Sequence, residues 1–241
     1  TVSCDAESCP SAVGLFIGPK DSEAEPMHCT AVLVGDSTAV TAGHCVGLDT
    51  RTCDGSWLGF PSRNSQAQSS LEWVRCKRVQ YVQVPRIYRR ATQADGIAVG
   101  DAAYLEPDYA VVEIERSLAL SPIEVSDSRA TNGDVVQMVS LKADRFYENT
   151  HQIVARRCRV QDAMTLGAPG QYVRALSECP IRIGDSGAPL LNEEGQLLGI
   201  VHAGKPPFLA VGVMTALRNK RDCPKPKPKL RAKCIGSISH F

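Results

Sequence analysis

Residues 184–202 read GDSGAPLLNEEGQLLGIVH, and this stretch carries the pattern on which the fold prediction rests. A serine between glycine-rich neighbours, Ser186, is followed by apolar residues that turn residues interrupt. The last apolar segment, Gln196–His202, has the length of one β-strand and lacks the longer period of a helix. The stretch therefore predicts β structure after a glycine turn.

Segments of the same kind recur along the 241 residues, and Gly, Pro, Asp and Ser separate many of them. They are Ala31–Val34, Val79–Val84, Tyr109–Ile114, Val135–Leu141, Gln152–Val160 and Leu209–Met214. We expect at most a short helix, at Thr215–Arg221. Many short strands predict an all-β sandwich or barrel. The polar segment Asp54–Gly100 is predicted to be a long loop region with some strand.

Composition narrows the class of protein. Lys and Arg total 27 against 26 Asp and Glu, a formal net charge of +1, which gives no reason to expect nucleic acid or a membrane surface as a partner. The sequence contains no apolar run of the roughly 18 residues that a membrane helix needs. Hydrophobic residues make up 43% of the chain, enough for a full core.

Ten cysteines without a CxxC pair favour disulfides over a zinc ribbon, although buried free thiols remain an alternative. Disulfides persist in oxidising compartments, so we expect a secreted or periplasmic protein. Proximity in sequence predicts the pairs Cys4–Cys9, Cys53–Cys76 and Cys223–Cys234, the last across a Pro-Lys tail.

Three separated motifs contain the residue types of nucleophilic catalysis: TAGHC at 41–45, DYAVV at 108–112 and GDSGAP at 184–189. A serine hydroxyl needs a base, and histidine suits this role because its ordinary pKa lies near neutrality. A carboxylate then fixes the imidazole tautomer and stabilises the imidazolium. Glycine beside the serine lets backbone N–H groups approach a developing oxyanion.

These motifs, in the order histidine, aspartate, serine, resemble those of the chymotrypsin (trypsin-like) family of serine peptidases, including its secreted bacterial branches. The resemblance implies an all-β fold of two six-stranded antiparallel β-barrels with the active site between them. We expect one peptidase domain over residues 1–241, with the first barrel at about 12–120, the second at about 121–222 and a tail at 223–241.

The resemblance also assigns roles to single residues. His44, Asp108 and Ser186 would form the catalytic triad, and the backbone N–H groups of Gly184 and Ser186 would form the oxyanion hole. Asp185 would be a structural carboxylate shaping that hole, with His28 as a hydrogen-bond partner.

Two disulfides follow from the same comparison. Cys29 and Cys45, separated by 16 positions, match the family disulfide beside the catalytic histidine. Cys158 and Cys179 flank the segment before Ser186, and we predict that they pair and close the loop leading to the substrate pocket.

The chain departs from the family pattern in two places. His44 and Asp108 are 64 positions apart, longer than in most relatives, so Asp95 and Asp101 remain alternatives for the triad carboxylate. Only Asp108 precedes an apolar run that resembles the family strand. The Ile/Val-Val-Gly-Gly start of animal trypsins is missing, so any activation is expected to be of another kind.

The predicted substrate pocket comprises Pro180, Ile181, His202, Gly204 and Gly212. Pro180 stands where trypsin-type members place an acidic floor residue, so we expect an apolar or aromatic side chain at the cleavage site. A glutamate-preferring pocket is the alternative, because glutamate-specific members carry a histidine in this strand, one residue earlier. His202 would otherwise face Asp108 and orient it, in place of the usual serine.

The resulting prediction is a serine endopeptidase that needs no metal or organic cofactor. Its partners would be protein or peptide substrates and protein inhibitors, and we expect a monomer. A non-catalytic binding protein with the same fold is the rival hypothesis, although such relatives usually lose a triad residue.

Overall fold

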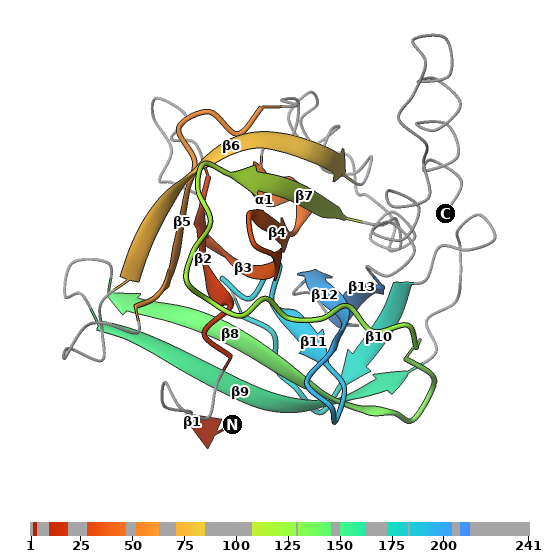
Figure 1. The fold of residues 1–241 in the computed structure, drawn as a ribbon. Helices are drawn as coiled ribbons and strands as arrows, with labels where there is room; N and C mark the ends of the chain where they lie inside the picture. Colours follow the sequence, from red (N-terminus) through yellow and green to blue (C-terminus); the bar gives the residue numbers. More distant parts are fainter. Residues whose placement is uncertain are drawn as a thin grey trace, which may run out of the picture.

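The fold is given by a computed structural model, which describes residues 2–3, 10–18, 28–46, 52–62, 71–84, 108–128, 130–145, 150–161, 173–182, 184–203 and 208–212. Apart from one helical turn, α1 (Gly43–Val46), the regular elements in these ranges are β-strands. Among these residues, no helix has the length and apolar character to cross a membrane. The strands form two sheets, which Figure 1 shows one above the other.

Six antiparallel strands close into the first barrel, in the order β2-β3-β4-β7-β6-β5. They are β2 (Val13–Ile17), β3 (His28–Gly35), β4 (Thr38–Thr41), β5 (Trp57–Pro61), β6 (Leu71–Gln83) and β7 (Tyr109–Ile114). Closure leaves no unpaired sheet edge, so every strand has a partner on both sides.

Large apolar side chains fill this barrel, and glycines let its strands approach one another. Phe16 and Phe60 are fully buried in its core. A Cβ at Gly14 would lie 2.4 Å from the carbonyl oxygen of Gly59 and 2.6 Å from the Phe60 ring. Glycine at position 14 is therefore required by packing.

The second sheet contains seven strands. They are β1 (Val2–Ser3), β8 (Val135–Arg145), β9 (Thr150–Gln161), β10 (Val173–Ser177), β11 (Pro189–Leu191), β12 (Leu197–Ala203) and β13 (Phe208–Gly212). The order is β1-β9-β10-β13-β12-β11-β8, and β8 pairs again with β9, so six strands form a closed cycle with β1 added at β9. This arrangement confirms the predicted pair of antiparallel barrels.

The segment Asp54–Gly100 contributes two strands to the first barrel, β5 and β6. Residues 63–70 and 85–100 lie outside the described ranges, so the predicted loop content of the segment stays a prediction. In β6 the register shifts twice against β7, after Cys76 and after Val79, which interrupts the alternation that sequence patterns rely on. All seven strand segments predicted from apolar runs overlap strands, and Val213, Met214 and Thr215–Arg221 lie outside the described residues.

The connection between the barrels is bonded to both of them. Ile123 donates its backbone N–H to Leu33 of β3 at 2.9 Å, and Ser126 donates to Leu197 of β12 at 2.9 Å. Ile200 of β12 is buried in the same cluster as the first barrel. The second sheet is thus packed against the first, and the segments that carry His44, Asp108 and Ser186 meet between them. The division of the chain at residue 120 stays a prediction.

Candidate active site

His44 and Asp108 are joined by two hydrogen bonds. The backbone N–H of His44 donates to Asp108 Oδ1 at 2.9 Å, and His44 Nδ1 lies 2.5 Å from Asp108 Oδ2. Asp108 immediately precedes β7 and is completely buried, whereas the His44 side chain is 14% exposed. A carboxylate held at Nδ1 leaves Nε2 as the ring atom available for proton transfer.

Gly43 makes this approach sterically feasible. A Cβ at Gly43 would lie 2.1 Å from the carbonyl oxygen of Gln83, at the end of β6, and 2.8 Å from Asp108 Oδ1. The turn α1 therefore packs directly against the strand ends that border Asp108. The disulfide Cys29–Cys45 ties α1 to β3 on its other side.

Burial and the neighbouring carboxylate act on His44 in opposite directions. Burial, the largest single influence, lowers the pKa of His44, while the charge and the hydrogen bond of Asp108 raise it. Together they leave the pKa of His44 above its usual value of 6.5. A base of this kind is neutral, and able to accept a proton, only on the alkaline side of that pKa.

The turn around Ser186 is fastened to the first barrel. Thr30 donates its N–H to the carbonyl oxygen of Ser186 at 2.7 Å and its hydroxyl to the carbonyl oxygen of Gly184 at 2.9 Å. Gly187 has a φ of 83°, and a Cβ there would lie 2.1 Å from the backbone carbonyl oxygen of Thr30 and 3.0 Å from the backbone nitrogen of Ala42. The serine turn thus packs against the backbone that leads into His44.

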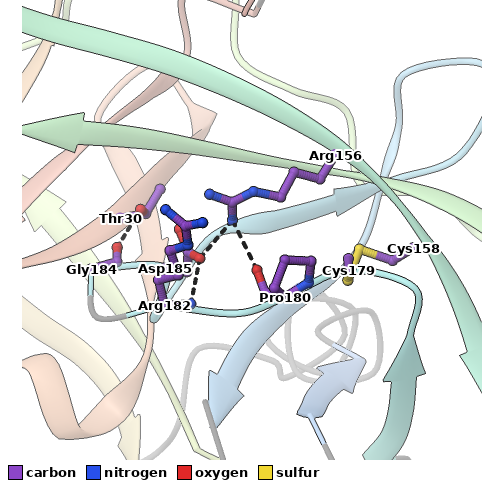
Figure 2. A network of polar contacts seen from close by, with 8 residues as sticks. All are labelled: Thr30, Arg156, Cys158, Cys179, Pro180, Arg182, Gly184 and Asp185. Carbon is purple, nitrogen blue, oxygen red and sulfur yellow. Dashed lines mark hydrogen bonds and ion pairs between the residues drawn. A yellow bond between two sulfur atoms is a disulfide. The ribbon is translucent and has the colours of Figure 1, made fainter. Parts of the chain in front are cut away.

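A buried ion pair fixes the same turn from the second barrel, as Figure 2 shows. Arg156 Nη1 donates to Asp185 Oδ2 at 2.7 Å and to the carbonyl oxygen of Pro180 at 3.3 Å. The backbone N–H of Arg182 donates to the same Asp185 oxygen at 2.8 Å. The side chains of Arg156 and Asp185 are 3% and 1% exposed. Asp185 therefore has a structural role, as predicted, with Arg156 as a buried partner, and the predicted hydrogen bond to His28 stays a prediction.

Arg156 was missed because three arginines share one strand segment, at 156, 157 and 159. Only Arg156 lies on the same face as Cys158 and Val160, which are buried, while Arg157 and Arg159 are exposed. The period-2 alternation of a strand contained this signal.

The residues predicted for the substrate pocket differ in how far they are exposed to solvent. Pro180 is exposed, Ile181 is buried, and Gly212 pairs with Gly199 at the end of β13. His202 is 1% exposed. Gly204 lies outside the described residues.

The three central disulfides are present: Cys29–Cys45, Cys53–Cys76 and Cys158–Cys179. The pairs Cys4–Cys9 and Cys223–Cys234, and the alternative aspartates Asp95 and Asp101, lie outside the described residues. In the described ranges, one group of side chains has the proximity of metal ligands: Cys29, His44 and Cys45. Its two cysteines are bonded to each other, so they offer no thiolate to a metal.

Comparison with known proteins decides the family. A family model described as a trypsin-like peptidase domain matches residues 29–200, most of the chain. The chain belongs to this family of trypsin-like peptidases. The match spans all three motifs and places the protein among proteases that act on proteins or peptides. No curated protein matches the chain.

Solved structures of low sequence identity share the fold of this trypsin-like domain. A Glu endopeptidase is 15% identical, with a TM-score of 0.57, and the alignment covers 91% of this chain and 95% of that one. A scabies mite inactivated protease paralogue, S-I1, is 16% identical, with a TM-score of 0.60 and coverage of 88% and 93%. Human heparin binding protein is 12% identical, with a TM-score of 0.60 and coverage of 94% and 98%. Because these relatives differ in what their names describe, the shared fold alone does not assign an activity.

Proposed function

We propose that this trypsin-like peptidase is a serine endopeptidase in which His44, Asp108 and Ser186 act as a catalytic triad. The observation that carries the proposal is the double hydrogen bond between His44 and a fully buried Asp108. A buried carboxylate on Nδ1 has the geometry that activates a serine hydroxyl through Nε2. The packing of the serine turn against Thr30 and Ala42 supports Ser186 as the nucleophile.

In the proposed reaction, Nε2 of His44 takes the hydroxyl proton of Ser186 as the serine oxygen attacks the scissile carbonyl carbon. The N–H groups of Gly184 and Ser186 stabilise the oxyanion of the tetrahedral intermediate. The imidazolium then gives its proton to the leaving amine, and an acyl-enzyme remains. Water, deprotonated by His44, hydrolyses the acyl-enzyme in the same manner.

The proposed substrate side chain at the cleavage site is apolar or aromatic. Pro180 and Ile181 place no acidic group at the predicted floor, which disfavours arginine or lysine. The burial of His202 weighs against direct contact between its ring and a substrate carboxylate, and so against the glutamate-preferring alternative. The disulfides support secretion or export to a periplasm.

A fluorophosphonate probe tests the nucleophile directly. The protein should be labelled once, at Ser186, and Ser186→Ala should lose labelling and lower peptide hydrolysis by about 10⁴-fold or more while keeping its thermal unfolding. A folded parent without labelling would favour the non-catalytic hypothesis. A library of peptide substrates then reads the preference at the cleavage site.

A further inference from the structure

The outer face of strands β5 and β6 carries both tryptophans of the chain. Trp57 and Trp73 are 37% and 36% exposed, whereas the residues that alternate with them, Leu58 and Val74, are buried in the core of the first barrel. The two strands lie side by side in Figure 1. Tryptophan is highly buried on average, so two exposed tryptophans on one sheet face call for an explanation.

Trp73 lies with one face of its ring on the backbone of β5. Gly59 is its cross-strand partner, and a Cβ at Gly59 would lie 2.8 Å from Cζ3 and 2.9 Å from both Cε3 and Cη2 of Trp73. Nearly equal distances to three consecutive ring atoms mean that the face of the ring, rather than its edge, covers the glycine. Because the side chain is 36% exposed, the opposite face of the indole is open to solvent.

Arg75 adds a cation to this surface. It pairs with Trp57 across the strands, and its guanidinium carbon lies 4.9 Å from the centroid of the Trp57 ring. Lys77 and Arg78, further along β6, both form ion pairs with Glu113, whereas Arg75 is exposed and has no carboxylate partner among the described residues. A guanidinium that stacks on an aromatic ring keeps the N–H groups at its edge available to an anion.

We propose that Trp57, Trp73 and Arg75 form a binding surface for a polysaccharide of uronic acids. The C–H groups on one face of a sugar ring are weakly positive and suit the negative face of an indole. The carboxylate of a uronic acid suits the planar fork of Arg75, which can donate two parallel hydrogen bonds to it. The inference goes beyond the proposed peptidase reaction and does not depend on it.

The geometry of the sheet favours a sugar over an acidic peptide as the occupant. Backbone N–H and C=O groups lie in the plane of a sheet, and those of β5 pair with β2 on one side and with β6 on the other. A peptide laid across this face would turn its own backbone groups toward ring carbons, which offer no hydrogen bonds. A sugar instead stacks through its C–H groups and keeps its hydroxyls at the rim, in water.

The surface lies toward the opposite end of β6 from the candidate active site. Trp73 and Gln83 are 10 positions apart, and the carbonyl oxygen of Gln83 borders Gly43 beside Asp108. With a rise of about 3.3 Å per residue, the separation along the strand is about 30 Å. A polymer bound here would leave the triad open, so the role of the surface is to retain the peptidase on material that contains uronic acids.

Intrinsic fluorescence tests the proposal, because both tryptophans of the chain lie on this surface. The probe is polygalacturonate, titrated into the full chain at low and at high salt. Dextran, a neutral polysaccharide, and polyglutamate, an acidic polymer without sugar, are titrated in parallel. Trp73→Leu removes the stacking ring and Arg75→Gln removes the charge. Arg159→Gln removes the same charge from an exposed position on β9 and is the control.

We expect polygalacturonate to shift the tryptophan emission and to bind less tightly as salt rises, because salt screens the contact between guanidinium and carboxylate. Trp73→Leu and Arg75→Gln should each raise the Kd by about 10-fold, the effect of losing one stacked ring or one charge-assisted hydrogen bond. Arg159→Gln should bind as the parent does. Calorimetric titration gives the Kd values, and thermal unfolding checks that each variant is folded.

Four outcomes would overturn the proposal. They are no binding of polygalacturonate, equally tight binding of dextran, equally tight binding of polyglutamate, and a parental Kd in folded Trp73→Leu or Arg75→Gln. Tight binding of polyglutamate would indicate a surface for acidic peptides, and tight binding of dextran a surface for neutral sugars. Since Arg75 is exposed, Arg75→Gln keeps the test valid if Trp73→Leu does not fold.

Discussion

At the scale of single residues, the candidate site depends on how its buried polar groups are partnered. Asp108 is bonded to the backbone and the ring of His44, and Asp185 is bonded to Arg156 and to the backbone of Arg182. Each carboxylate is buried, so losing its partner would leave an uncompensated charge. The consequences of substitution should therefore be large and specific to these positions.

Asp108→Asn should lower turnover by about 10⁴-fold near neutral pH, because the amide holds the imidazole of His44 in the wrong tautomer. The acid limb of the rate profile should also move to lower pH, since the charge of Asp108 raises the pKa of His44. Steady-state kinetics on Asp108→Asn, Asp95→Asn and Asp101→Asn, with circular dichroism as a folding control, checks both effects. An active Asp108→Asn enzyme beside an inactive Asp101→Asn enzyme would reassign the carboxylate.

His202 should make the folded protein sensitive to acid. Burial lowers the pKa of His202 to about 4 in the folded protein, against about 6.5 in the unfolded chain. Between pH 4 and pH 6.5 the unfolded chain therefore binds one more proton at this residue than the folded protein does. Stability contributed at this site is therefore lost as pH falls from about 6.5 to about 4, by roughly 3 kcal/mol. Urea unfolding of the parent and of His202→Leu at pH 7 and pH 4.5 measures the difference, which should shrink in the variant. Equal acid sensitivity in both proteins would show that His202 does not titrate in this way.

At the scale of elements, strand β9 supports the serine turn from the second barrel. Arg156 points inward to Asp185 and Pro180, and two residues later Cys158 is bonded to Cys179 on the same loop. Figure 2 shows both attachments reaching the loop from one strand. The loop that carries the candidate oxyanion donors is thus fixed by an ion pair and by a covalent bond.

Arg156→Met should destabilise the protein by about 3–5 kcal/mol, because Asp185 would remain buried without a cation. Arg159→Met is the matched control on the same strand, since its ion pair with Glu178 is exposed and worth no more than about 1 kcal/mol. Urea unfolding of both variants gives the comparison. Equal destabilisation of the two variants would contradict the structural role of the buried pair.

At the scale of the whole molecule, the site exists only where the two barrels meet. α1 lies beside β4 and β7 of the first barrel, and β11 and β12 belong to the second sheet (Figure 1). Asp108 immediately precedes β7, and the serine turn immediately precedes β11. Thr30 bonds across this boundary to Gly184 and Ser186. Removing a disulfide next to this boundary should therefore lower both stability and activity, whereas removing one in the first barrel should lower stability alone.

The double variant Cys158→Ala/Cys179→Ala opens a loop with a sequence separation of 21 and should lose about 3 kcal/mol of stability. The double variant Cys53→Ala/Cys76→Ala opens a loop of similar separation, 23, and should lose a similar amount. Only the first should also lower kcat in the folded enzyme, because Cys179 directly precedes the segment that contains Pro180 and Asp185 and leads to Ser186. Calorimetry and kinetics on both variants check this, and equal kcat values would contradict it.

The sequence alone predicted the strands that are continuous apolar runs and the three motifs with their chain order. Those features depend on local pattern: apolar segments such as Tyr109–Ile114 need no partner to be recognised, and glycine beside Ser186 signals a close backbone approach. The pairing of Cys29 with Cys45 followed from spacing within a family resemblance. Strand β6 was predicted only over its last residues, because its exposed side chains and register shifts hide the alternation. Strand β5 was not predicted, since its five residues include Gly59 and Pro61, which are unfavourable in strands.

Tertiary structure decided which charged groups meet. Arg156 and Asp185 are 29 positions apart. Strand alternation places Arg156 on the face of Cys158 and Val160, but only the tertiary packing brings that face against Asp185. The burial of His202 likewise depends on packing, since a single apolar strand has two faces and only packing determines which is covered. Burial then sets the charge state of that imidazole, because removing it from water costs far more for the cation than for the neutral ring.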